Sequence, residues 1–160
     1  SSIGMGRADD LEQLAAAFRQ AAEYDHLVLA ERWISGAEYT AAILGRSALP
    51  LIRLETPNVF YDYAAKYQAD STRYHCPCGL PVEAERALQG LAMEAFQAVG
   101  GSGWGRVDIL MDEQQRPFLI EVNTVPGMTD HSLVPMAAAA AGIDFDELVW
   151  RILDASLERD

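Results

Sequence analysis

The stretch RVDILMDEQQRPFLIEVNTVPGM, residues 106–128, decides the fold, because it predicts two strands joined by a polar turn. Side chains two positions apart on a strand share a face, so Arg106 points the same way as Asp108, and Glu121 the same way as Asn123. Three oxygen-bearing side chains beside an arginine predict a site for a hard cation that carries phosphates. The alternative is a pair of edge strands with solvated charges. The charges interrupt otherwise apolar runs, however, and buried strands seldom carry unpaired Asp or Glu.

The remaining elements form a mixed series of helices and strands. Helices are predicted after Asp9 or Asp10, from Pro81 to the Gly100-Gly101 pair, over 133–141, and from Asp144, where Glu147 completes a capping box. Spacings of three and four give the first helix an apolar stripe, and the last helix is expected to bury Leu148, Val149, Ile152 and Leu153. Strands are predicted over 26–31, 38–45 and 48–55, the last two as an antiparallel pair. The predicted fold class is therefore α+β.

Composition excludes several classes of protein. A chain of 160 residues with 50% hydrophobic residues can bury one sizeable core with a small appended lobe. The net charge of −12 argues against a nucleic-acid partner. No apolar run approaches the roughly 20 residues that span a bilayer, and no signal peptide opens the chain. The two cysteines, Cys76 and Cys78, form neither a disulfide framework nor a usual zinc pair, so we expect a cytoplasmic protein without a membrane partner.

Two loops, residues 56–79 and 1–7, are candidate functional segments. Residues 56–79 carry no hydrophobic period, and loops this long are usually functional lids or disordered. All but one of the 12 basic residues are arginine, and the exception, Lys66, lies in this loop. Ser1 to Arg7 is a loop of small residues whose backbone N–H groups can wrap an anion, although a plain linker explains it as well.

Six motifs together resemble the C-terminal half of the D-alanine–D-alanine ligases, members of the ATP-grasp superfamily. They run through the chain in the family's order: SSIGM (1–5), ERWISGAE (31–38), FYDYAAKY (60–67), GWGRVD (103–108), EVNTVPGM (121–128) and HSLVPM (131–136). The resemblance implies the ATP-grasp fold. It also implies ATP-dependent joining of two D-alanines through an acylphosphate, which supplies the dipeptide of peptidoglycan.

The resemblance also assigns roles at the reacting end. It implies that Asp108, Glu121 and Asn123 hold two Mg²⁺ (or Mn²⁺) ions that bridge the ATP phosphates. Arg106 would stabilise the charge on the acylphosphate and the tetrahedral intermediate, helped by the backbone N–H of Gly127. The start of the helix at Ser132 and Leu133 would receive the carboxylate of the second D-alanine.

At the nucleotide end, the resemblance implies a hinge, a ribose acceptor and a closing loop. The adenine hinge would be Glu31, Arg32, Trp33 and Ile34, and Glu38 would accept hydrogen bonds from the ribose. The closing loop would contain Tyr61, Lys66 and Tyr67, with Lys66 neutralising phosphate charge and Tyr67 bonding toward Ser1. Arg32 departs from the family, where many members carry lysine.

The family's N-terminal domain and the first half of its central domain have no counterpart here, so we expect a fragment that is inactive alone. Residues 1–31 would be a remnant of the central lid subdomain, and residues 32–160 the C-terminal catalytic subdomain with a lid loop at about 56–78. In the full-length protein the resemblance implies a homodimer whose small-molecule substrates are ATP and D-alanine.

Two other functions stay open. One is another ATP-grasp ligase that joins a carboxylate to an amine or hydroxyl, such as a D-alanine–D-lactate ligase, against which the Lys66-Tyr67 pair argues. The other is a nucleotide-binding module without catalysis, against which the full set of Arg106, Asp108, Glu121 and Asn123 argues. His26, His75 and His131 are given no catalytic role.

Overall fold

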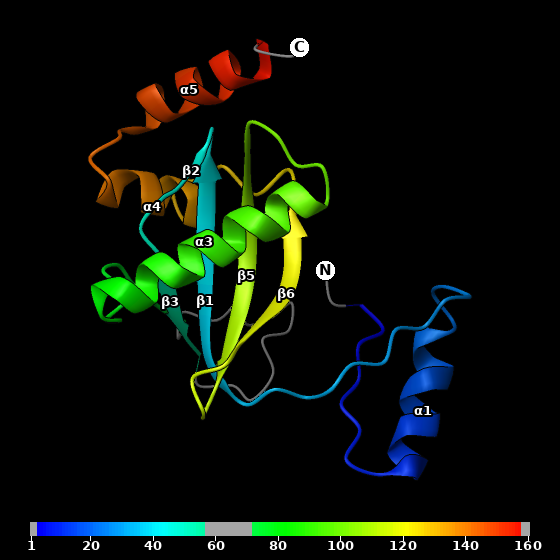
Figure 1. The fold of residues 1–160 in the computed structure, drawn as a ribbon. Coiled ribbons are helices and arrows are strands. Elements are labelled where there is room, and N and C mark those ends of the chain that lie inside the picture. The colour runs from blue at the N-terminus through cyan, green and yellow to red at the C-terminus, as the bar shows by residue number, and fades with distance from the viewer. Residues whose placement is uncertain (1–2, 57–71, 158–160) are drawn as a thin grey trace. The chain divides into compact units, whose positions relative to one another are not determined.

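The computed structural model describes residues 3–56 and 72–157, which divide into two compact units. Residues 3–34 belong to the first unit, and residues 35–55 with 73–157 form the second. Helix α1 (Leu11–Ala21) lies in the first unit, and every described strand lies in the second (Figure 1). The second unit therefore supplies the sheet on which the predicted cation site depends.

The second unit contains six strands and three helices among its described residues. In chain order they are β1 (Gly36–Leu44), β2 (Ser47–Ala48), β3 (Ile52–Glu55), β4 (Arg73–His75), α3 (Val82–Ala98), β5 (Trp104–Asp112), β6 (Pro117–Asn123), α4 (Leu133–Ala140) and α5 (Phe145–Leu157). The strands are ordered β4-β3-β1-β5-β6, with β2 pairing to β1, and all pairs are antiparallel. The α+β prediction is confirmed.

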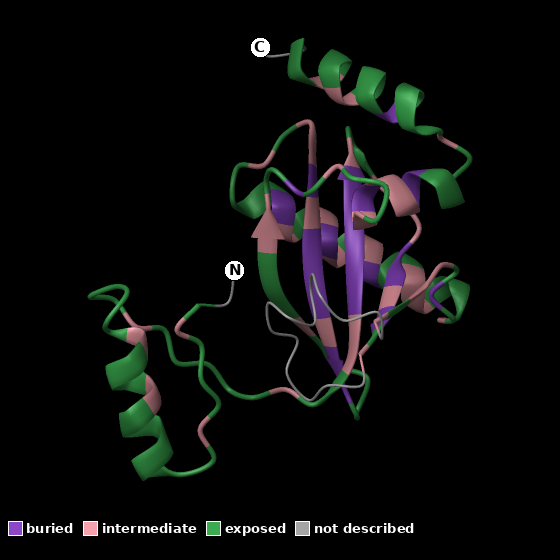
Figure 2. Cartoon of the chain, turned by 180° about the vertical axis from the view of Figure 1, so that it is seen from behind, coloured by how far each residue is buried: buried purple, intermediate pink, exposed green. Residues whose placement is uncertain are grey.

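The two faces of the sheet differ in what they carry. Helix α3 crosses one face and packs Leu88, Ala92 and Phe96 against Ile43, Val107 and other strand residues in the core cluster (Figures 1 and 2). Residues at alternate positions point to the opposite face, which α4 approaches at β1. Thr40, Arg106 and Asp108 belong to that second face, because they alternate with core residues along β1 and β5.

Helix α3 ends as the sequence predicts and begins one residue late. The N–H of Gly101 donates to the Phe96 carbonyl and that of Gly100 to the Gln97 carbonyl, each at 2.9 Å, which is the pairing of a Schellman motif. Pro81 is the N-cap of α3 and not its first helical residue, because its extended backbone still belongs to the incoming loop. The difference is one position.

The predicted strand 48–55 is interrupted at Pro50, so β2 and β3 are separate strands. Proline has no N–H for a ladder, which explains the break. The backbone beside it is satisfied by α3, because Leu51 N–H donates to Glu85 at 2.9 Å and the Gln89 amide donates to the Leu49 carbonyl at 3.0 Å. These bonds anchor the break to the helix that covers the core.

The start of β1 requires glycine. Gly36 pairs with Asp112 at φ +157°, and a Cβ at this position would lie 1.8 Å from the Met111 carbonyl oxygen. No side chain fits against that backbone, so β1 can reach β5 over its full length only with glycine here. In the same ladder Thr40 lies opposite Asp108.

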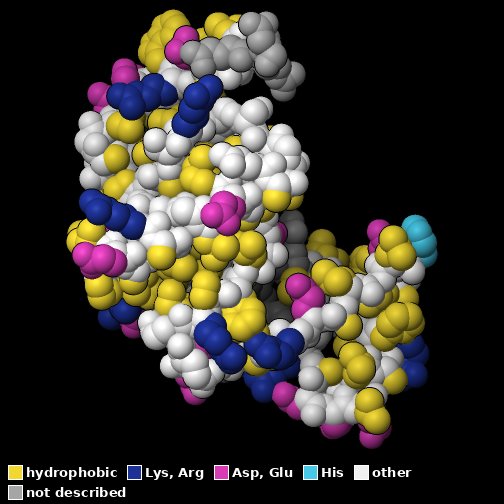
Figure 3. Space-filling model, viewed as in Figure 1, with side chains coloured by type: hydrophobic (Ala, Val, Ile, Leu, Met, Phe, Trp, Pro, Cys, Tyr) yellow, Lys and Arg dark blue, Asp and Glu magenta, His cyan; other side chains and the backbone are white. Residues whose placement is uncertain are grey.

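One prediction about the first unit needs correction. Residues 26–35 form no strand, because Leu27 and Leu29 are exposed and the described part of this unit offers no second strand with which to pair. Helix α1 does form, and the Asp10 side chain caps it by accepting from the Gln13 N–H at 2.8 Å. Helix α1 has no buried residue, and the surface of this unit carries many hydrophobic side chains (Figure 3).

Helices α4 and α5 form where predicted, but α5 departs from the prediction in its capping and in its burial. Asp144 caps α5 by accepting from the Glu147 N–H at 2.9 Å, while the Glu147 carboxylate pairs with Arg151 instead of completing the box. Of the four residues expected in the core, only Leu148 is buried, because α5 contacts chiefly α4. Across the described residues, no helix is long and apolar enough to cross a membrane.

Candidate functional site: a carboxylate cluster on strands β5 and β6

The predicted cation ligands meet on one sheet face. In the β5–β6 ladder, Arg106 lies opposite Asn123 and Asp108 lies opposite Glu121. A β-bulge follows this pair, since Ile109 is next paired with Leu119 and Ile120 is left over. The bulge explains how both Leu119 and Ile120 can be apolar while Glu121 and Asn123 still share a face with Asp108.

Hydrogen bonds join these side chains into one network. Arg106 grips Asp108 with two bonds, Nε to Oδ1 at 2.8 Å and Nη2 to Oδ2 at 2.6 Å. The Asn123 amide donates to Asp108 Oδ2 at 3.3 Å and to Glu121 Oε1 at 3.2 Å. Arg106 Nη2 also lies 3.9 Å from Glu121 Oε1. The structure therefore confirms that the four residues share a face and contact one another.

A fifth residue, which the sequence analysis missed, completes the network. The Thr40 hydroxyl donates to Asp108 Oδ1 at 2.6 Å, and both residues are buried. Thr40 lies opposite Asp108 in the β1–β5 ladder. Its position two residues after Glu38 on a predicted strand was the available signal, but its partner is 68 residues away and only the register reveals it. We call Thr40, Arg106, Asp108, Glu121 and Asn123 the carboxylate cluster.

The burial of the carboxylates distinguishes a cation site from the alternative of edge strands with solvated charges. Strand β5 is central, and Asp108 is only 6% exposed, so it is not a solvated charge on an edge strand. Strand β6 ends the described sheet order, and the Glu121 side chain is 46% exposed. The cluster thus has a buried, fully bonded carboxylate at its base and an accessible one at its rim.

The charge balance of the cluster suits a cation. One guanidinium faces two carboxylates, which leaves a net charge of −1 among the three ionisable side chains. The two carboxylates attract positive charge, because N–H groups of Arg106 and Asn123 already point into the space between Asp108 and Glu121. Carboxylate and amide oxygens are the ligands that Mg²⁺ and Mn²⁺ accept, and rotation of the Asn123 amide would turn its oxygen inward. The residues therefore fit a divalent cation.

The described residues hold no group of three or more His, Cys, Asp or Glu side chains able to bind a metal. This does not conflict with the cluster, whose ligand set contains two carboxylates and one amide. A set with so few charges is typical of a cation that also binds phosphate or water oxygens.

A second pair of predicted residues, Gly127 and Ser132, meets beside α4. A Cβ on Gly127 would lie 2.9 Å from Ser132 Oγ, so the Gly127 backbone and the Ser132 hydroxyl lie close together. Ser132 is the N-cap of α4, but its hydroxyl accepts from the Thr129 N–H at 2.9 Å and gives the helix no side-chain cap. The first turn of α4, beginning at Leu133, therefore keeps backbone N–H groups that could receive a carboxylate.

The nucleotide residues divide between the two units. Glu31 to Ile34 lie in the first unit in a segment without helix or strand, where the Arg7 guanidinium stacks 4.8 Å from the Trp33 ring centroid. Glu38 lies in the second unit on β1, half-buried and two residues before Thr40, so it shares the face of the carboxylate cluster. Ser1, Tyr61, Lys66 and Tyr67, and with them the core of the predicted lid loop, lie outside the described residues.

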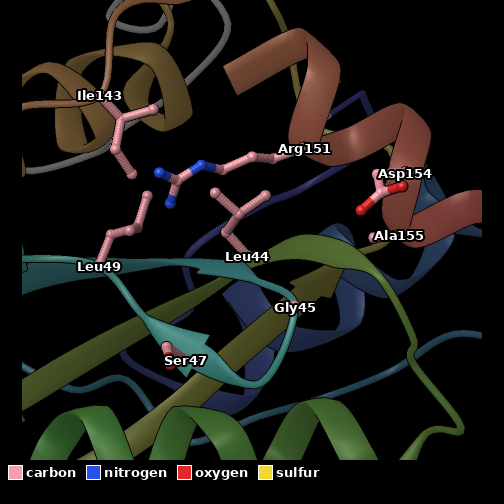
Figure 4. A pocket seen from close by; sticks show the side chains of 8 residues that line it. All are labelled: Leu44, Gly45, Ser47, Leu49, Ile143, Arg151, Asp154 and Ala155. Carbon is pink, nitrogen blue, oxygen red and sulfur yellow. The ribbon is translucent and has the colours of Figure 1, made fainter. Parts of the chain in front are cut away.

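A further pocket lies between the β1–β2 turn and α5 and shares no residue with the cluster (Figure 4). It is lined by Leu44, Gly45, Ser47, Leu49, Ile143, Arg151, Asp154 and Ala155. Arg151 reaches toward the leucines, but its Nε is paired with Glu147 at 2.7 Å. Apart from Ser47, Asp154 and the paired Arg151 the wall is apolar, and we assign this pocket no role.

Comparison with known proteins places this geometry in a family. The model of the D-ala D-ala ligase C-terminus matches residues 1–154. The D-alanine–D-alanine ligase of Nitrosococcus oceani is 64% identical over 159 residues, and that of Methylococcus capsulatus is 65% identical over 156 residues. The alignments cover 99% and 98% of this chain and 50% of each relative. The chain spans about half the length of the curated relatives it matches.

Solved structures agree with the sequence relatives. A Bacillus anthracis D-alanine–D-alanine ligase complexed with ATP superposes with a TM-score of 0.79 at 34% identity, covering 92% of this chain and 48% of that one. The VanG D-Ala:D-Ser ligase of Enterococcus faecalis gives 0.85 at 31% identity, covering 97% of this chain and 46% of that one. These neighbours confirm the predicted ATP-grasp fold, and the chain belongs to the D-alanine–D-alanine ligase C-terminus family.

Proposed function

We propose that this chain is the ATP- and metal-binding part of a ligase that joins two D-alanines. The single observation that carries the proposal is the carboxylate cluster, in which the buried Asp108 is paired with a partly buried arginine beside an accessible carboxylate and an amide. Family membership supports ATP and D-alanine as substrates, since the relatives named above are D-alanine–D-alanine ligases and one solved neighbour holds ATP.

The reaction that follows has two steps. A carboxylate oxygen of one D-alanine attacks the γ-phosphorus of ATP, and ADP leaves as the acylphosphate forms. The amine of the second D-alanine then attacks the carbonyl carbon, the carbonyl–oxygen bond to phosphate breaks, and the amine loses a proton. Both steps develop negative charge on oxygen, so they depend on positioning and electrostatic stabilisation.

Asp108, Glu121 and Asn123 would hold the divalent cations, two Mg²⁺ or Mn²⁺ ions, that neutralise phosphate charge. Arg106 would turn its planar fork from Asp108 toward the oxygens of the acylphosphate and the tetrahedral intermediate. The Arg106 side chain is 18% exposed, so its guanidinium lies in a partly dry environment, where electrostatic stabilisation is stronger than in water.

The second substrate would bind between Gly127 and the first turn of α4. The close approach of Gly127 to Ser132 supports this, because it leaves backbone N–H groups and a hydroxyl near one another without an intervening side chain. Gly127 N–H would donate to the oxyanion, and the Ser132–Leu133 end of α4 would bind the carboxylate of the second D-alanine.

The nucleotide would lie along the same face of the sheet. Glu38 would accept from the ribose hydroxyls, which its position two residues from Thr40 supports. The backbone of Glu31, Arg32, Trp33 and Ile34 would pair with adenine. Lys66, Tyr61 and Tyr67 would close a lid over the phosphates, with Tyr67 bonding toward Ser1. Residues 1–31 would be the remnant of the central lid subdomain, and the intact protein would be a cytoplasmic homodimer.

A neighbouring activity is favoured by one observation. The VanG D-Ala:D-Ser ligase has the same fold at a TM-score of 0.85 and 31% identity, so a ligase whose second substrate carries a side-chain hydroxyl is the second candidate. A D-alanine–D-lactate ligase is the corresponding alternative with a hydroxyl nucleophile. For all three we propose the same phosphoryl chemistry at the cluster, so the identity of the second substrate distinguishes them.

The test is phosphate release from ATP by the full-length ligase that contains this chain. D-Alanine is offered alone or with D-serine or D-lactate, and the product is identified by mass spectrometry. We expect D-alanyl-D-alanine with one phosphate released for each dipeptide, and loss of turnover in Glu121→Gln. Binding of ATP without D-alanine-dependent phosphate release would instead support a non-catalytic nucleotide module. The 160-residue chain alone is expected not to ligate.

A further inference from the structure

Thr40 belongs to the carboxylate cluster, although the sequence analysis did not predict it. It is 2% exposed and lies in the middle of β1, between core residues Tyr39 and Ala41. A buried hydroxyl must find a partner, and this one donates to Asp108 Oδ1 at 2.6 Å. That short distance is typical of a bond to an ionised carboxylate.

The donors on Asp108 divide between its two oxygens. Oδ1 accepts from the Thr40 hydroxyl and from Arg106 Nε, whereas Oδ2 accepts from Arg106 Nη2 and Asn123 Nδ2. A carboxylate offers about four lone-pair sites, so four donors occupy it fully. A cation can bind Asp108 only if at least one of these donors withdraws.

The donors differ in how easily they can withdraw. The Asn123 bond is the longest at 3.3 Å, and Asn123 lies at the end of an outer strand of the described sheet. Arg106 has a long side chain with several rotatable bonds. Thr40 is β-branched, stiff about χ1 and enclosed in a central strand, so its hydroxyl stays where it is. The oxygen that becomes available is therefore Oδ2, on the side of Glu121 and Asn123.

We infer that Thr40 is a positioning residue for the cation site. It holds Asp108 Oδ1 so that Oδ2 remains directed toward Glu121 and Asn123 when Arg106 and Asn123 release it. This inference rests on the proposed function, because it takes the cluster to be the site of the divalent cation. Thr40 itself touches neither substrate nor metal, and its effect passes through the orientation of Asp108.

The experiment measures Mn²⁺ binding by electron paramagnetic resonance in the full-length ligase, with a non-hydrolysable ATP analogue present. This readout does not depend on turnover. Thr40→Val removes the hydroxyl but nearly keeps the shape of the side chain, and Thr40→Ser keeps the hydroxyl. Ser156→Ala is the matched control, because it removes a hydroxyl that donates to a backbone carbonyl on α5.

We expect Thr40→Val to weaken Mn²⁺ binding roughly ten- to a hundredfold, the usual effect of losing an outer partner of a metal ligand. Thr40→Ser should bind Mn²⁺ nearly as well as the parent protein, and so should Ser156→Ala. Thr40→Ala serves in place of the valine variant if circular dichroism shows that the latter does not fold. Parent-like Mn²⁺ binding by the folded variant that lacks the hydroxyl, or an equal loss in Thr40→Ser, would overturn the inference.

Glu121→Gln separates failure of this inference from failure of the proposed function. If Glu121→Gln loses Mn²⁺ while Thr40→Val retains it, the cluster is the metal site and only the role of Thr40 is wrong. If both variants bind Mn²⁺ as the parent does, the cation lies elsewhere and the proposed metal site fails as well.

Discussion

Strand β5 carries two buried aspartates whose surroundings differ. Asp108 and Asp112 lie four residues apart, share a sheet face, and are 6% and 8% exposed. Each pairs with an arginine, at 2.6 Å for Arg106 and 2.8 Å for Arg116. Burial and pairing alone would therefore assign the two carboxylates the same role.

Their other partners differ in kind. Asp112 accepts from the backbone N–H groups of Gln114 at 3.0 Å and Arg116 at 2.8 Å, all within its own hairpin turn. Among the described residues, Asp108 accepts from side chains alone, and these come from β1, β5 and β6. Backbone donors cannot leave without undoing the turn, whereas side-chain donors can rotate away. We therefore assign Asp112 a structural role in the turn, whereas Asp108 can exchange a side-chain donor for a cation.

The largest expected difference is in ligation. In the full-length ligase, Asp108→Asn should lower the rate of D-alanine-dependent phosphate release by orders of magnitude, because metal stabilisation of transition-state charge contributes several kcal/mol. Asp112→Asn should leave the rate within a few-fold of the parent. An equal loss of phosphate release in the two folded variants would contradict the different roles that we assign to Asp108 and Asp112.

The two arginines should differ next. Arg106→Lys should lower kcat roughly a hundredfold, comparable to removing one oxyanion donor, while the KM for ATP changes little. Lysine cannot reproduce the planar fork that grips Asp108 and would face the reacting oxygens. Arg116→Lys is the control, since the Arg116 side chain is 61% exposed at the turn. A raised KM with unchanged kcat in Arg106→Lys would place Arg106 in ground-state binding instead.

Sequence reasoning reached the cluster because strand alternation is a local rule. Arg106 with Asp108, and Glu121 with Asn123, each share a face by spacing alone, and the pairing of β5 with β6 follows from a short hairpin. Thr40 could not be found in this way, because its bond to Asp108 depends on the register between strands far apart in the chain. In that register Gly36 lies so close to the Met111 carbonyl that no side chain fits there.

Local sequence patterns predicted less well which residues are buried and which element packs against each helix or strand. The spacing of apolar residues predicted both α1 and α5, yet α1 buries no side chain and α5 buries only Leu148. An apolar stripe indicates that a helix can pack, but the packing partner is set by tertiary structure. The predicted strand over 26–31 failed for the same reason, since a strand forms only beside another strand.

Thermal stability should show that Asp112 holds its turn chiefly through its backbone hydrogen bonds and less through its ion pair with Arg116. Asp112→Ala should lower the Tm more than Arg116→Ala does, because it deprives two turn N–H groups of their acceptor, whereas Arg116 is largely exposed. Differential scanning calorimetry of the two variants is the measurement. A smaller loss in Asp112→Ala than in Arg116→Ala would mean that water replaces the acceptor without cost.

The smallest expected effect is in the pH dependence of stability. Burial alone would raise the pKa of Asp112, but hydrogen bonds from the Arg116 backbone and guanidinium hold it below its ordinary value of 3.8. The contribution of the carboxylate is therefore complete above pH 3.8 and is lost as the pH falls from there through the folded pKa. The difference in unfolding free energy between the parent and Asp112→Asn should be constant near neutral pH and shrink below pH 3.8. Denaturant titrations across this range test it, and a difference that grows on acidification would contradict the assignment.

Metal binding tests the central distinction most directly. Mn²⁺ is titrated into the full-length ligase with a non-hydrolysable ATP analogue, and the free ion is followed by electron paramagnetic resonance for the parent, Asp108→Asn and Asp112→Asn. If Asp108 is the exchangeable carboxylate of a cation site, its variant loses high-affinity Mn²⁺ binding while Asp112→Asn binds as the parent does. High-affinity binding retained in Asp108→Asn would contradict this account of the cluster.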